Sequence, residues 1–186
     1  MRTLNKKQHY IFLNDVNIFE NTERIINDTN TSKTIIIPHV CNNIDLFDAG
    51  FARNLAEKYP IAKENYHLLG KVFLKNNLGY CQIFKVNNNK KNKNSIYVAN
   101  MIVQRGIKSG RNTRPLNYFA LAKSMYGVSG FIEKYISATN TNDKVEIHAP
   151  KFGSGLSGGN WNFIADLIED VWHDYNVFIY SPRTQR

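Results

Sequence analysis

Cysteine is scarce in this chain, and long apolar runs are absent. The two cysteines, Cys41 and Cys81, match neither a metal-binding spacing nor a disulfide framework. Both stand in apolar, strand-like segments, so we expect buried, reduced thiols and no metal site. No apolar run approaches the roughly 18 residues needed to cross a bilayer, and the first residues lack the apolar segment of a signal peptide. We therefore expect a cytoplasmic protein with no membrane partner.

Negative charge is also in deficit. The chain has 24 Lys and Arg against 15 Asp and Glu, which gives a formal net charge of +9 and a pI near 9.5. Such a balance favours a phosphorylated ligand or a polyanionic partner. The cations are spread over several segments, namely Lys6–Lys7, Lys90–Lys93, Arg105–Arg114 and the final residues with Arg183 and Arg186. They form a nucleic-acid groove if they converge in space, and are scattered solvated side chains if they do not.

Strand-like and helix-like segments alternate along the whole chain. Residues 33–41 include the apolar run Thr-Ile-Ile-Ile-Pro-His-Val-Cys, typical of a strand buried on both faces. The alternation predicts an α/β fold in a single domain, residues 1–186, with a mostly parallel sheet covered on both faces. A hairpin is expected from 71–74 and 80–86, joined through Asn-Asn-Leu-Gly. The other expected strands are 9–13, 95–103, 144–149 and 176–180, and the expected helices are 47–59, 61–69, 115–136 and 161–173.

The segment after the buried strand carries polar groups suited to a ligand. His39, Asn42 and Asn43 follow directly on the apolar run, and an asparagine amide can both donate to and accept from ribose hydroxyls. Ala49 and Gly50 are small and open a helix, whose first N–H groups favour an anion by about 0.3–1 kcal/mol. A plain strand-to-helix turn is the alternative interpretation.

A second loop, residues 150–161, contains four glycines between Gly153 and Gly159. Successive backbone N–H groups in such a loop can point at a diphosphate. Ser154 and Ser157 add hydroxyl donors, and Asn160 is placed to cap the following helix. The glycines spell Gly-x-Gly-x-x-Gly, but a Rossmann turn follows the first strand of its unit, whereas this loop lies near the end of the chain. A merely tight turn would need fewer glycines.

Together the two loops resemble the macro domain family, over nearly the whole chain. Leu-Asn-Asp-Val at 13–16, Ile-Pro-His-Val-Cys-Asn at 37–42 and Asp-Ala-Gly-Phe at 48–51 follow the family's order of landmarks. Residues 97–107, 114–121 and 148–161 resemble a phage and bacterial branch, which is similar to the yeast-type ADP-ribose-1″-phosphate phosphatases. The resemblance implies a three-layer α/β/α sandwich around a mixed, mostly parallel sheet, with a cleft for ADP-ribose and no cofactor.

The resemblance also implies a role for individual residues. Asp15 would accept from the adenine amino group, and Asn42 would bind the distal ribose. Tyr180 would form part of the adenine wall, unless it is a core tyrosine. The remaining residues would line the diphosphate and distal ribose: Ala49, Gly50, Phe51, Gly153, Ser154, Gly155, Leu156, Ser157, Gly158 and Asn160.

Departures from the family pattern leave catalysis open. Asp48 replaces a usual glycine and Asn160 a usual aspartate, whereas His39 is retained. Asp48 or His39 would activate water or protonate a leaving group in a hydrolase acting on ADP-ribose-1″-phosphate or on an ADP-ribosyl group. The alternative is a non-catalytic reader, or a protein that sequesters an ADP-ribose-like signal. The ADP-ribose could be attached to a protein or a nucleic acid, in a bacterium or in a host cell if the gene is phage-borne.

Overall fold

A computed structural model describes residues 9–87, 93–139 and 145–181. The described strands form one six-stranded sheet in the order β1-β6-β5-β2-β4-β3. The cations at Lys6, Lys7, Lys90, Lys91, Arg183 and Arg186 lie outside the described residues. The strands are β1 (Tyr10–Asn14), β2 (Thr34–Asn42), β3 (Cys81–Lys85), β4 (Ser95–Gln104), β5 (Val145–Pro150) and β6 (Asn176–Ser181).

The sheet is mixed but mostly parallel. β2 pairs in parallel with β4 and β5, and β6 pairs in parallel with β5 and β1, whereas β3 runs antiparallel to β4. The central strand β2 is buried along nearly its whole length, as its continuous apolar run predicts.

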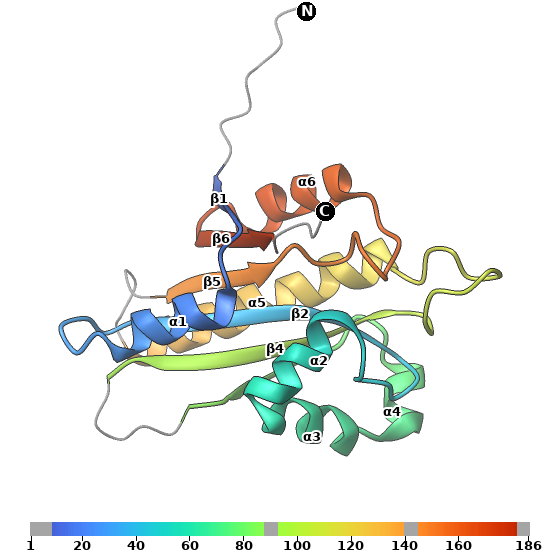
Figure 1. Ribbon diagram of the computed structural model, residues 1–186, viewed down its shortest axis with the longest axis horizontal. Coiled ribbons are helices and arrows are strands. Elements are labelled where there is room, and N and C mark those ends of the chain that lie inside the picture. The colour runs from blue at the N-terminus through green and yellow to red at the C-terminus, as the bar shows by residue number, and fades with distance from the viewer. Residues whose placement is uncertain (1–8, 88–92, 140–144, 182–186) are drawn as a thin grey trace, which may run out of the picture.

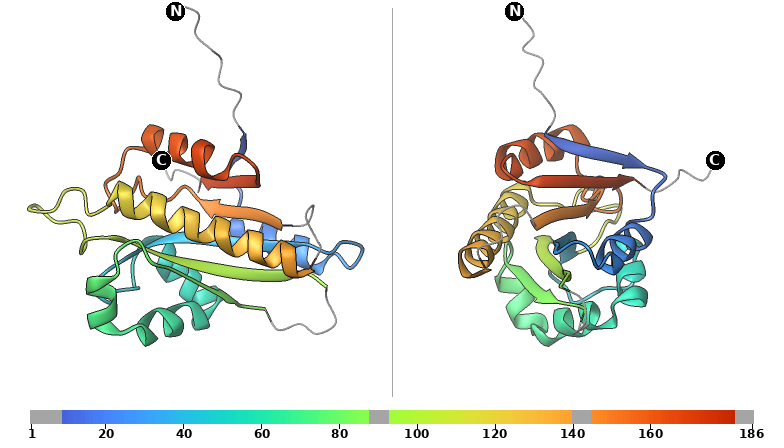
Figure 2. Two further views of the ribbon diagram at one scale, coloured as in Figure 1. Left: turned by 180° about the vertical axis from the view of Figure 1, so that it is seen from behind. Right: turned by 90° about the vertical axis from the view of Figure 1, so that its left-hand side faces the viewer.

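Helices cover both faces of the sheet (Figures 1 and 2). One core packs α5 (Tyr118–Thr139) and α6 (Trp161–Trp172) against one face. The second core, on the other face, includes side chains of the remaining four helices. These are α1 (Ile18–Asn27), α2 (Gly50–Lys58), α3 (Pro60–Leu68) and α4 (Gly70–Asn76). The α/β class and the three-layer arrangement are therefore confirmed.

Two local predictions need correction, and one helix was missed. Residues 71–74 form part of helix α4 and not a hairpin strand, and β3 pairs instead with β4. Only Leu74 of α4 is buried, and an apolar segment this short does not distinguish strand from helix. Helix α5 begins at Tyr118 and not at Pro115, because Asn117 Oδ1 accepts from Ala120 N–H and caps the first turn. Helix α1 was not predicted.

The topology brings two loops together. β2 and β5 are parallel neighbours, so their carboxyl ends meet at one edge of the sheet. The loop before α2 and the glycine-rich loop (residues 151–160) both leave that edge. This is where open α/β sheets bind ligands.

Candidate ligand-binding cleft

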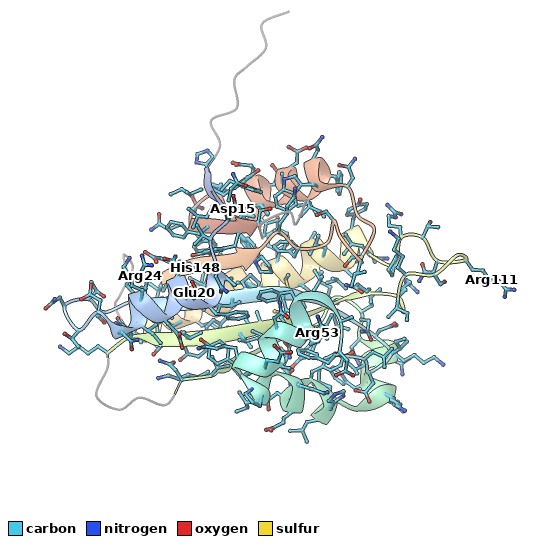
Figure 3. The ribbon with its side chains drawn as sticks, viewed as in Figure 1. Asp15, Glu20, Arg24, Arg53, Arg111 and His148 are labelled. Atoms are coloured by element: carbon cyan, nitrogen blue, oxygen red, sulfur yellow. The ribbon has the colours of Figure 1, made fainter. Side chains whose placement is uncertain are left out.

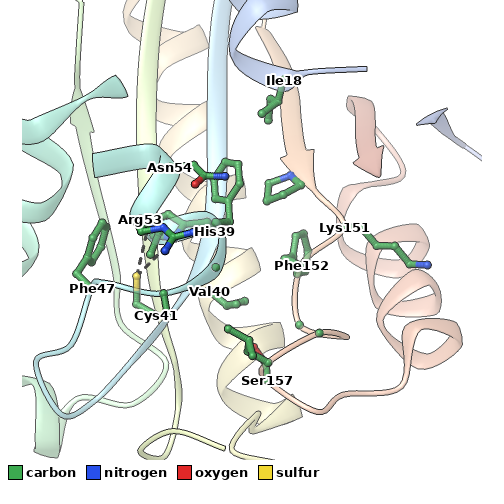
Figure 4. A pocket seen from close by; sticks show the side chains of 18 of the residues that line it. Ile18, His39, Val40, Cys41, Phe47, Arg53, Asn54, Lys151, Phe152 and Ser157 are labelled. Carbon is green, nitrogen blue, oxygen red and sulfur yellow. Dashed lines mark hydrogen bonds between the residues drawn. The ribbon is translucent and has the colours of Figure 1, made fainter. Parts of the chain in front are cut away.

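A cleft of about 1390 Å³ lies at the carboxyl ends of β2 and β5, between the amino end of helix α2 and the glycine-rich loop (Figure 4). Its other walls come from the start of α1 and from the residues after β4. Of the fifteen residues given a binding or catalytic role in the comparison with the family pattern, twelve line it: Asp15, His39, Asn42, Asp48, Ala49, Gly50, Phe51, Gly153, Gly155, Leu156, Ser157 and Tyr180. Asn43, the other polar residue noted after the buried strand, does not line it.

The amino end of α2 lines the cleft, and no acceptor in the described part of the chain takes a hydrogen bond from the backbone N–H groups of residues 50–52. Ala49 occupies the N-cap position and provides no side-chain acceptor. Gly50 has a φ of +56°, which favours glycine, and a Cβ there would lie 3.3 Å from Leu156 Cδ1 on the opposite loop. The first N–H groups of a helix have no intrahelical partner, so this end attracts an anion.

The glycine-rich loop forms the facing wall. Gly153 has a φ of +79°, and a Cβ there would lie 2.8 Å from Ile164 Cδ1, so the backbone packs closely on α6. Among the described residues, no acceptor takes a hydrogen bond from the backbone N–H groups of residues 154–157. Two sets of N–H groups therefore border the cleft.

Asn42 organises the loop that follows β2. Its Oδ1 accepts from Ile44 N–H at 2.9 Å and from the Tyr66 hydroxyl at 3.0 Å, and its Nδ2 donates to the Leu46 carbonyl at 2.5 Å. One amide N–H remains for a ligand, since Nδ2 carries two hydrogens. Asn43 ties the same loop to the residues after β4, because its Oδ1 accepts from Gly106 N–H.

His39 is buried under the cleft, with 1% of its surface exposed. Asn100 Nδ2 donates to Ala62 and Gln82, which leaves Asn100 Oδ1 facing His39 Nε2 at 2.6 Å. His39 therefore carries its proton on Nε2 and donates it to Asn100. Burial lowers the pKa of His39 to about 4, although the Asn100 hydrogen bond opposes the shift. The ring is neutral at pH 7.

Asp48 lies at the cleft rim, with 70% of its side chain exposed. Its Oδ1 accepts from Lys63 Nζ on α3 at 2.6 Å. The hydrogen bond and charge of Lys63 lower the pKa of Asp48. The lysine offsets the negative charge that the sequence places beside the expected phosphates.

Ser157 is buried, and its Oγ accepts from Gln104 Nε2 at 2.6 Å. Gln104 is the last residue of β4 and also lines the cleft. With its oxygen accepting from Gln104, the Ser157 hydroxyl can donate its own proton to a ligand.

The far end of the cleft is apolar and aromatic. Phe19 and Phe51 stack with ring centroids 5.5 Å apart, and both line the cleft. Asp15 follows β1 in a left-handed conformation, with φ +59°, and its N–H donates to the Ser181 carbonyl. Asp15 (labelled in Figure 3) lines the cleft and stands two residues before Asn17, which caps α1.

Tyr180 belongs to a buried polar network that borders this end. Its hydroxyl accepts from Asn21 Nδ2 at 2.6 Å and lies 2.6 Å from His148 Nδ1. Burial lowers the pKa of His148, and its Nε2 faces the acceptor-only Glu146 carboxylate, so the ring proton is on Nε2 and the Tyr180 hydroxyl donates to Nδ1. His148 Nε2 in turn faces Glu146 Oε2 at 3.0 Å, and Glu146 Oε1 accepts from Lys33. Tyr180 is 2% exposed, so it is a core tyrosine that also touches the cleft.

Three predicted residues do not line the cleft. Asn160 caps α6 by accepting from Asn162 N–H, and its own N–H donates to the Tyr118 hydroxyl. Gly158 packs beneath the loop of residues 105–114, named here the basic arm; a Cβ there would lie 2.3 Å from the Thr113 carbonyl oxygen. Ser154 lies in the glycine-rich loop outside the lining.

Sequence reasoning missed several lining residues. Phe19 is one, because helix α1 was not predicted, although Asn17 followed by apolar residues at helical spacing carried the signal. Four cations also line the cleft, namely Arg53, Lys58, Lys108 and Lys151, and Lys58 is paired with Glu23. No run of sequence brings these four together.

Within the described ranges, no three His, Cys, Asp or Glu side chains gather to hold a metal ion. No described helix is long and apolar enough to cross a membrane.

No family model and no curated protein matches the sequence. Solved structures do match its fold. A protein of unknown function from Bacteroides thetaiotaomicron is 26% identical with a TM-score of 0.71, over 95% of this chain and 99% of that one. A macrodomain protein from Streptomyces coelicolor is 21% identical with a TM-score of 0.61, over 92% and 97%. Thermosipho africanus DarTG in complex with ADP-ribose is 13% identical with a TM-score of 0.57, over 95% of this chain and 54% of that one. The chain therefore has the macrodomain fold.

Proposed function

We propose that the cleft binds ADP-ribose or a close derivative. The observation that carries this proposal is the pair of facing backbone N–H rims, one at the amino end of α2 and one in residues 155–157 of the glycine-rich loop, which line the cleft. They are set close enough that Leu156 reaches Gly50. Two such rims suit the two phosphates of a diphosphate, because oriented N–H groups stabilise oxyanions. The ADP-ribose complex of a protein with the same fold supports the choice of ligand.

The two ends of the cleft suit the two ends of this ligand. The stacked rings of Phe19 and Phe51 offer an apolar wall to adenine, and the Asp15 carboxylate accepts from its amino group. At the other end, the free N–H of Asn42 and the hydroxyl of Ser157 donate to the distal ribose. Arg53 lines the cleft and adds positive charge.

The site chemistry favours a reader or sequestering protein over a hydrolase. His39 is neutral at pH 7, and its one proton is donated to buried Asn100. The Lys63 pair lowers the basicity of Asp48, and a general base works best with a pKa near the operating pH. Neither residue is well tuned for proton transfer.

Hydrolysis at the distal ribose, as in the phosphatase branch that the sequence resembles, is the second candidate. The observation in its favour is that Asp48 is an ionised carboxylate at the rim of the cleft. Such a group could orient a water molecule without taking its proton. A phosphate, a protein or a nucleic acid are the candidate groups at the distal ribose.

The test is calorimetric titration with ADP-ribose, with phosphate release from ADP-ribose-1″-phosphate measured on the same samples. We expect micromolar affinity, about −8 kcal/mol, and no phosphate release. Ser157→Ala should weaken binding by about 2- to 10-fold through loss of one hydrogen bond. Ser154→Ala is the matched control in the same loop and should leave affinity unchanged.

Each outcome decides between the candidates. Absence of ADP-ribose binding would reject the proposed ligand. Binding with release that is abolished in Asp48→Asn would establish the hydrolase. Binding without release, at equal or higher affinity in Asp48→Asn, would support the reader, because the substitution removes a negative charge near the phosphates.

A further inference from the structure

The basic arm, residues 105–114, joins β4 to α5 and extends away from the body of the protein, with Arg111 at its far end (Figures 1 and 3). It contains no acidic residue. Among the described residues, no carboxylate forms an ion pair with any cation of the arm. Its four cations are Arg105, Lys108, Arg111 and Arg114.

The arm is held in shape by its own hydrogen bonds. Asn112 Nδ2 donates to the carbonyls of Arg105 and Ile107, at 2.8 and 3.1 Å, and Asn112 and Ser109 exchange backbone hydrogen bonds. At the base, Arg105 N–H donates to the Pro115 carbonyl. A preorganised loop loses less conformational entropy on binding than a flexible one.

Aromatic rings stand at the base of the arm. The Arg114 guanidinium lies 4.8 Å from the centre of the Tyr118 ring, and Phe163 packs edge-on against Tyr118 at 4.5 Å. Phe119 is 81% exposed and Phe163 is 46% exposed. Phe119 and Phe163 therefore present exposed ring surface to a planar partner, whereas Tyr118 is half-buried against Arg114 and Phe163.

The arm is continuous with the cleft. Ile107 and Lys108 line the cleft, and the Gly106 N–H is held by Asn43 in the loop that Asn42 organises. The Thr113 backbone rests on Gly158 of the glycine-rich loop. A molecule bound along the arm would therefore pass the cleft mouth at the Asn42 end.

We propose that the basic arm and the exposed rings at its base bind a single strand of nucleic acid, laid across the mouth of the cleft. Repeated cations match a repeated phosphate charge, and exposed aromatic rings stack on unpaired bases irrespective of sequence. An acidic peptide would use the cations but not the rings. The proposal does not depend on which ligand the cleft holds.

The experiment measures fluorescence anisotropy of a labelled single-stranded oligonucleotide of mixed sequence, titrated with the full chain at several salt concentrations. Arg111→Ala should weaken binding and reduce the salt slope by about 0.7, the value for one phosphate contact on a single strand. Phe119→Ala should weaken binding by about 5-fold or more with an unchanged slope, because stacking does not release counterions. Lys134→Ala, which makes the same change in net charge near the other end of α5, is the matched control.

Neither Arg111 nor Phe119 lines the cleft, so both variants should bind ADP-ribose with wild-type affinity in calorimetry. That result would also show that the two variants are folded. Absence of ADP-ribose binding by the wild type would count against the proposed cleft ligand and would leave the arm proposal unaffected. Equal effects of Arg111→Ala and Lys134→Ala would overturn the arm proposal, since binding would then follow net charge. It is likewise overturned if the oligonucleotide does not bind at low salt, if Phe119→Ala binds as wild type, or if a polyglutamate peptide competes as well as the unlabelled strand.

Discussion

Replacing Gly158 by alanine tests whether the glycine-rich loop is built to pass beneath the basic arm. The residue has a φ of +68°, and an alanine in this region costs about 1–2 kcal/mol. The added Cβ would lie 2.3 Å from the Thr113 carbonyl oxygen and 3.0 Å from the Arg114 Cα. Both are backbone atoms that cannot rotate away, and such overpacking costs about 1–3 kcal/mol. We therefore expect Gly158→Ala to lower the free energy of unfolding by about 2–5 kcal/mol.

Urea denaturation measures this change, and a thermal melt should show Tm lower by about 5–15 °C. Gly155→Ala is the control in the same loop, because no atom lies within 4 Å of its added Cβ and its φ is not in the left-handed region. It should remain within about 0.5 kcal/mol of wild type. If Gly158→Ala were as stable as Gly155→Ala, the close contact between the loop and the arm would be refuted.

Three further predictions concern the core. The His39 pKa near 4 lies below its value in the unfolded chain, so the unfolded state binds the proton more readily. The free energy of unfolding should therefore fall by about 3 kcal/mol as pH falls from 6.5 to 4. His39→Gln should flatten that part of the pH dependence of the free energy of unfolding, measured by urea denaturation, and an unchanged pH dependence would reject a buried neutral ring. Tyr180→Phe removes the hydroxyl that His148 Nδ1 accepts from, which should cost about 1–3 kcal/mol in urea denaturation; a neutral effect would exclude the buried network. In α5, Gly130→Ala should raise the free energy of unfolding by about 0.5–1 kcal/mol, because the added Cβ meets no atom within 4 Å. Gly127→Ala should lower it, because the added Cβ would lie 2.9 Å from Cys81 Cβ. Thermal melts that shift Tm in the same direction for both variants would contradict the packing of α5 on β3.

Local patterns in the sequence were sufficient for the framework of the site. The apolar run of β2 indicated a strand buried on both faces, and four glycines between a strand and an amphipathic helix indicated a loop that exposes its backbone. These features depend on neighbouring residues and on the backbone freedom of glycine. Parallel pairing of the strands then brought both loops to one edge of the sheet.

The electrostatics of the cleft depended on tertiary structure. Asp48 is paired with Lys63 from another helix, and His39 is bonded to Asn100, which lies 61 residues away. Whether a carboxylate is balanced or an imidazole is neutral depends on burial and on partners that only the packed chain brings within hydrogen-bonding distance. The sequence by itself therefore indicated the two loops that face each other across the cleft, whereas the walls from α1 and from the residues after β4 came from the tertiary structure. The tertiary structure decided the charge and proton positions within the cleft, because these arise from contacts between residues that are distant along the chain.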